Sequence, residues 1–162
     1  MISLYRIDTR AVRVDVSLGG GRRRSGEVFL HHGAVKHTGD ETLLDLLNDP
    51  HPFFPLRVTD PAPATILIAK SHVHCMFVPS MGDDERIAEA RSTATRLEVM
   101  IELDDEQEIE GTIYAELPQG QQRTLDFVNS PGAPFLVLVQ ASRDCIVNRS
   151  RIQAIRDADP RL

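Results

Sequence analysis

Residues Val12–Leu18, with the sequence VRVDVSL, have a close counterpart later in the chain, and this similarity predicts the architecture. Leu97–Leu103, with the sequence LEVMIEL, shows the same alternation 85 positions further on. Alternating apolar and polar residues are typical of a strand with one buried face. In both places a polar turn follows, then a glycine, Gly26 or Gly111, and then a second apolar stretch. The two regions therefore predict two similar hairpins.

The match between the two regions continues along the chain. Three more pairs of segments keep the same order: 44–48 with 125–129, 52–56 with 134–138, and 68–73 with 147–152. The offset between the copies drifts only from 85 to 79 residues. Five blocks in one order, with insertions confined to turns, predict an internal duplication. We therefore expect one copy over residues 1–78, a partly helical linker over 79–96 and a second copy over 97–162.

Each copy predicts two strands, a short helix and then further strands, which places the chain in the all-β class with short helices. Asp40 or Thr42 is the expected N-cap of the first helix, and Thr124 that of the second. Pro50 and Pro131 follow the helices and stop them. In the linker, residues 83–91 form a helix with few apolar side chains, so we expect it to be solvated. Strands this short leave open edges unless each copy closes into a barrel or the copies pair edge to edge.

The hairpin with its glycine, followed by a terminal strand pair around a short turn with Asn, Arg or Lys, resembles the Sm-like small β-barrel. The inserted helix at 44–48 and the Pro-Phe-Phe-Pro-Leu strand at 52–56 are similar to an uncharacterised group of bacterial Sm-like domains. The resemblance covers residues 12–78 and 97–156. It implies two tandem Sm-like barrels joined by a linker helix, and it implies no established reaction. The Sm-type RNA-binding pattern is missing from both copies.

Composition narrows the classes of function. The chain has 162 residues and a formal net charge of -6, which argues against bulk nucleic-acid binding. No apolar run approaches the roughly 20 residues of a membrane span. Cys75 and Cys145 are too few for a disulfide framework, so we expect a cytoplasmic protein.

A cationic turn is the first candidate binding site. Arg22, Arg23 and Arg24 follow a run of three glycines, and the corresponding turn of the second copy, 104–106, is acidic. The three guanidinium groups are suited to binding nucleic acid, a nucleotide or an acidic partner. The opposite charges also favour assembly guided by the two tips. A plain solvated turn is the third interpretation.

Four apolar residues form the second candidate site, a protein interface: Phe53, Phe54, Phe135 and Leu136. Core packing explains them most simply. The flanking prolines, however, favour an edge strand, because proline cannot donate to a strand ladder. Such an edge can bind a partner by strand addition.

The sequence contains no motif that predicts a catalytic site or a metal site. The chain has no nucleophile elbow, P-loop or dinucleotide fingerprint, and we predict no catalytic residue and no cofactor. Asp104 and Asp105 are expected on a solvated turn with ordinary pKa values. We predict no metal site, because none of the possible ligands shows the spacing of a zinc site: His31, His32, His37, His72, His74 and Cys75.

The sequence therefore predicts a non-enzymatic module for protein interaction or assembly, acting through self-association or a protein partner. The alternative is a regulator that binds nucleic acid or a nucleotide through Arg22–Arg24.

Overall fold

The computed structural model describes residues 9–32, 39–82 and 84–158, and His37 lies outside these ranges. Over this part the chain is mainly β with short helices, as predicted. The strands are β1 (Thr9–Ser17), β2 (Arg23–His31), β3 (Phe53–Val58), β4 (Ala64–Ala69), β5 (Cys75–Pro79), β6 (Thr95–Leu103), β7 (Glu108–Ala115), β8 (Phe135–Val139), β9 (Arg143–Asn148) and β10 (Ile152–Asp157). The helices are α1 (Leu43–Asn48), α2 (Glu85–Thr93) and α3 (Thr124–Asn129), with single 3₁₀ turns η1 (Lys70–His72) and η2 (Arg149–Arg151).

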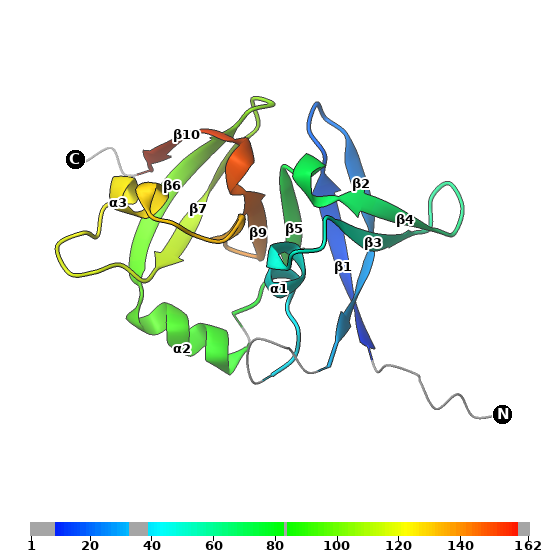
Figure 1. Ribbon diagram of the computed structural model, residues 1–162, viewed down its shortest axis with the longest axis horizontal. Coiled ribbons are helices and arrows are strands. Elements are labelled where there is room, and N and C mark those ends of the chain that lie inside the picture. The colour runs from blue at the N-terminus through cyan, green and yellow to red at the C-terminus, as the bar shows by residue number, and fades with distance from the viewer. Residues whose placement is uncertain (1–8, 33–38, 83, 159–162) are drawn as a thin grey trace.

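The strands of the described residues form one continuous antiparallel sheet in the order β10-β6-β7-β8-β9-β5-β1-β2-β3-β4. The N-terminal half supplies β1 to β5 and the C-terminal half supplies β6 to β10, and each half has the same internal strand order. Figure 1 shows the halves side by side, with α2 at the lower edge. The halves meet where β5 pairs with β9, and the sheet ends at β4 and β10.

The two glycines singled out in the sequence lie where neighbouring strands approach most closely. A Cβ atom at Gly26 would lie 2.3 Å from the carbonyl oxygen of Arg57. A Cβ atom at Gly111 would lie 2.7 Å from the carbonyl oxygen of Val139. Because no side chain fits there, glycine lets β2 cross β3 and β7 cross β8 in the same way.

The two hydrophobic cores share the strands of the junction. Alternate residues of β5 face opposite cores: Met76 packs into the N-terminal core, and Phe77 packs into the C-terminal core. Ile146 and Cys145 of β9 divide in the same way. Both strands are therefore buried on both faces, which explains the apolar runs Cys75–Val78 and Cys145–Val147. Burying both faces fixes the two halves against each other.

Each half has one short helix, inserted before its third strand. Thr42 is the N-cap of α1, as predicted, and its side chain accepts from the backbone N–H of Asp45. The prediction for α3 was wrong: its N-cap is Arg123, whose backbone N–H donates to the Asp126 carboxylate. Thr124 instead donates from its hydroxyl to Asp157 of β10. That bond ties α3 to the last strand.

The linker helix α2 is solvated, as predicted. Asp84 caps it by accepting from two backbone N–H groups, and none of its residues is buried. Among the described residues, no helix has the length and hydrophobicity needed to cross a membrane.

Candidate functional site at the sheet edges

The junction between the halves is a strand pair formed by edges. β5 and β9 run antiparallel in register from Cys75 opposite Val147 to Pro79 opposite Arg143. Backbone bonds join the same halves beyond the ladder, since the N–H of Asn148 donates to the carbonyl of His74 at 3.0 Å. The molecule thus already contains one contact of the kind that edge-to-edge assembly requires.

Side chains fasten the end of this junction at which Cys75 lies opposite Val147. The Asn48 side chain of α1 binds the Phe135 backbone of β8, accepting from its N–H at 2.9 Å and donating to its carbonyl at 3.4 Å. Asn148 donates from its side chain to the carbonyl of Val73 at 2.9 Å. These amide side chains bind backbone groups of the other half, so they fix the relative position of the halves.

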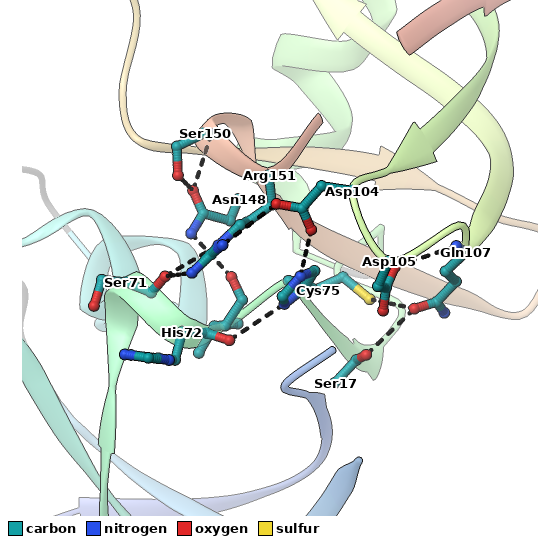
Figure 2. A network of polar contacts seen from close by, with 12 residues as sticks. Ser17, Ser71, His72, Cys75, Asp104, Asp105, Gln107, Asn148, Ser150 and Arg151 are labelled. Atoms are coloured by element: carbon teal, nitrogen blue, oxygen red, sulfur yellow. Dashed lines mark hydrogen bonds and ion pairs between the residues drawn. The ribbon is translucent and has the colours of Figure 1, made fainter. Parts of the chain in front are cut away.

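A polar network lies above the junction (Figure 2). Arg151 donates to the carbonyl of Ser71 at 2.8 Å and to Asp104 at 3.3 Å. Ser17, at the end of β1, donates to Gln107 at 3.3 Å. The turn after β6 is thereby attached to the N-terminal half.

Asp104 also binds His74, whose Nε2 lies 2.6 Å from a carboxylate oxygen. Partial desolvation raises the pKa of Asp104, but its bonds to His74 and Arg151 outweigh that effect. Its pKa is therefore below the usual range, contrary to the expectation of an ordinary value. His74, Asp104 and Asp105 each bring one possible metal-ligand atom within 4.8 Å of the others. Of these three residues, Asp104 already binds a cation, the guanidinium of Arg151.

The outermost strands, β4 and β10, are largely exposed, whereas the junction strands, β5 and β9, are largely buried. The predicted repeat aligns β4 with β9 and β10 with β5. Leu67 of β4 is 69% exposed, whereas Ile146, its counterpart in β9, is fully buried. Phe53 is 54% exposed, whereas its counterpart Phe135 is 5% exposed. The apolar residues that form the internal junction thus have exposed counterparts at the free β4 edge.

The structure separates the four residues of the predicted interface. Phe54 lies in the N-terminal core and Leu136 in the C-terminal core. Phe135 lies at the junction, where Asn48 binds its backbone. Only Phe53 of the four is on the surface.

The predicted cationic site is an exposed tip. Arg22 ends the turn between β1 and β2, and Arg23 and Arg24 begin β2. Arg23 lies 5.6 Å from the centre of the Phe77 ring. The acidic turn of the other half contacts His74 and Arg151 and makes no salt bridge with the described arginines of this tip.

Sequence reasoning missed the side chains that join the halves, chiefly Asn48, His74 and Gln107. Asn48 carried a signal, because an asparagine ends the helical block in both copies. Comparison with family models, with curated proteins and with solved structures gave no match.

Proposed function

We propose that the protein is a non-enzymatic assembly module whose chains join head to tail through β4 and β10. The observation that supports this most directly is the internal pairing of β5 with β9. The strands aligned with that pair are the two free ends of the sheet. A contact between β4 of one chain and β10 of the next repeats the internal contact. Because the two surfaces differ, the contact is heterologous and produces a closed ring or an open filament.

The corresponding side chains suit such a contact. Asn129 ends α3 as Asn48 ends α1, and it is exposed. In the assembly it binds the Phe53 backbone of the neighbouring chain, as Asn48 binds that of Phe135. Leu67 and Phe53 then lose their exposure, which removes an apolar patch from water.

Charge also favours this arrangement. Within one chain, Gln107 of the C-terminal half meets Ser17 of the N-terminal half. The aligned residues are Arg22 and Glu102, which have opposite charges. In the assembly, Arg22 of one chain faces Glu102 of its neighbour. This gives the cationic tip an acidic protein partner in place of nucleic acid.

The finer description of the fold is part of the same proposal. Each half is an Sm-like small barrel in which a short helix is inserted before the third strand. The identical strand order of the halves and the equivalent crossings at Gly26 and Gly111 support it.

The proposal is tested by light scattering coupled to size exclusion, with two single-edge variants. Leu67→Lys places a charge on the β4 edge, and Ala154→Arg places one on the β10 edge. The wild type is expected to be an oligomer and each variant a monomer. A mixture of the two variants is expected to form a one-to-one dimer, because each retains the edge that the other lacks.

Phe29→Lys is the matched control, because Phe29 is an exposed apolar residue of β2, which is not an edge strand. It should assemble like the wild type. The proposal is contradicted by a monomeric wild type, or by a mixture of the two variants that stays monomeric. A high ratio of absorbance at 260 nm to that at 280 nm that falls with salt would instead favour nucleic-acid binding through Arg22–Arg24.

A further inference from the structure

A groove of about 540 Å³ lies beneath the linker helix, between the two halves. Residues of α1 and α2 form one side of it, and residues of β7, α3 and β8 form the other. This volume lies in the range of small-molecule binding sites, roughly 300–1,000 Å³. None of the residues that line the groove belongs to β4 or β10.

Helix α2 directs one of its faces into this groove. Ile87, Ala90, Arg91 and Ala94 line it and have the spacing of a single helical face. A helix usually buries such a face against a core. Here Ile87, Arg91 and Ala94 are only partly buried and Ala90 is exposed, so the face is not packed into a core.

An ion pair holds α2 in this position. Arg91 donates to the fully buried carboxylate of Asp144 at 2.9 Å, and its guanidinium lies 5.6 Å from the centre of the Tyr114 ring. The backbone N–H of Met81 donates to the same carboxylate oxygen at 3.0 Å. The helix is thus attached to β9 by a charged side chain, and the groove beside it stays open.

The opposite wall combines apolar surface with a cation. Phe127, Phe135 and Val137 line the groove beside Arg149, which is half-buried and lies 5.3 Å from the centre of the Phe127 ring. Arg149 donates through Nη2 to two backbone carbonyls. Within the described residues it forms no salt bridge, and its Nε and Nη1 reach no acceptor. A guanidinium with unused donors beside apolar walls favours an anion that carries an apolar body.

We propose that this groove binds a small amphipathic carboxylate, with its apolar body between α2 and β8 and its carboxylate on Arg149. Arg86, which also lines the groove and makes no salt bridge with a described residue, adds a second positive charge. The apolar walls supply affinity. Asp45 and Glu116 also line the groove, and the Asp45 carboxylate accepts from the backbone N–H of Thr42. The position of Arg149 beside the apolar wall therefore selects the sign of the head group.

The test is fluorescence titration of the full chain with 1-anilinonaphthalene-8-sulfonate, an amphipathic anion. Decanoate, 2-naphthoate and decanol serve as competitors. We expect saturable one-to-one binding, with decanoate or naphthoate displacing the probe at about tenfold lower concentration than decanol. The stronger of the two carboxylates shows whether the site prefers an aliphatic or an aromatic body.

Three variants locate the site. Ala90→Trp fills the groove from α2, and Arg149→Met removes the charge but keeps an apolar stem, so each should weaken binding about tenfold or more. Ala88→Trp is the control, because Ala88 is exposed on α2 and does not line the groove. It should bind as the wild type does.

Three results would overturn the proposal: absence of saturable binding, equal binding by the two tryptophan variants, or equal displacement by decanol and the carboxylates. If Arg149→Met does not fold, the comparison of Ala90→Trp with Ala88→Trp and the comparison of decanol with the carboxylates still test the proposal.

Discussion

β4 and β9 occupy corresponding places in the two halves, yet one is the exposed end of the sheet and the other lies in its middle. β9 is covered by β5 and is buried on both faces, whereas no strand of the described residues pairs with the outer side of β4. The sequences differ accordingly, since β9 places Asp144 and Cys145 where β4 has Thr65 and Ile66. The difference shows that the same strand can complete a core or remain available for a partner, depending on which strand covers it.

The largest contrast is expected between Ile146→Lys and Leu67→Lys, which introduce the same charge at aligned positions. Ile146→Lys buries an unpaired charge in the N-terminal core and should destabilise the chain by about 4 kcal/mol or more. Leu67→Lys should change stability by less than about 0.5 kcal/mol while abolishing assembly. Urea unfolding measures the first effect and light scattering the second. Unfolding of the Leu67 variant, or unchanged assembly by it, would contradict the comparison.

Asp144 of β9 is buried, whereas its counterpart Thr65 of β4 is exposed. Arg91→Met leaves the Asp144 carboxylate buried without its cation and should destabilise the chain by about 3 kcal/mol. Combining it with Asp144→Leu should recover most of that loss, because the charge that needs a partner is then absent. Urea unfolding of the two variants tests this, and a double variant no more stable than the single one would argue against it.

The two helix-ending asparagines provide a smaller contrast. Asn48→Ala removes two bonds to the Phe135 backbone within the chain, so it should cost about 1–2 kcal/mol of stability. Asn129→Ala should leave the stability of the single chain nearly unchanged and weaken assembly. Urea unfolding and light scattering over a range of protein concentrations separate the two effects. Equal loss of stability in both variants would mean that Asn129 already has a role within the chain.

Much of the fold could be predicted because local patterns determine it. Period-two alternation located the hairpins, and the first helix begins after Thr42, one of its two predicted caps, and ends before Pro50. The cap of α3 was missed, since Asp126 accepts from the backbone of Arg123 while Thr124 bonds to a distant strand.

The junction was only partly predictable. Edge-to-edge pairing of the copies was one of two expected solutions, but the choice of β5 and β9 depends on which faces remain apolar after each half folds. The bonds of Asp104 with His74 and Arg151 join residues 30 and 47 positions apart, so no local pattern shows them. The neighbours Phe53 and Phe54 show a second limit, because a run of apolar residues does not show which of them face the core.

The smallest expected effect is a change of stability at acidic pH. It depends on Asp104, whose counterpart in the other turn is the uncharged Gly19. The pKa of Asp104 is lowered in the folded chain, so the folded state binds fewer protons than the unfolded state near pH 4. The stability that Asp104 contributes is therefore complete above about pH 5 and is lost as the pH falls through its lowered pKa. Thermal unfolding of the wild type and of Asp104→Asn between pH 5 and pH 2 tests this. The wild type should have the higher Tm at pH 5, and the difference should shrink on acidification. The lowered pKa values of Asp49 and Asp126 occur in both proteins and cancel in the comparison. A difference that stays constant down to pH 2 would mean that the Asp104 carboxylate does not help to hold the halves together.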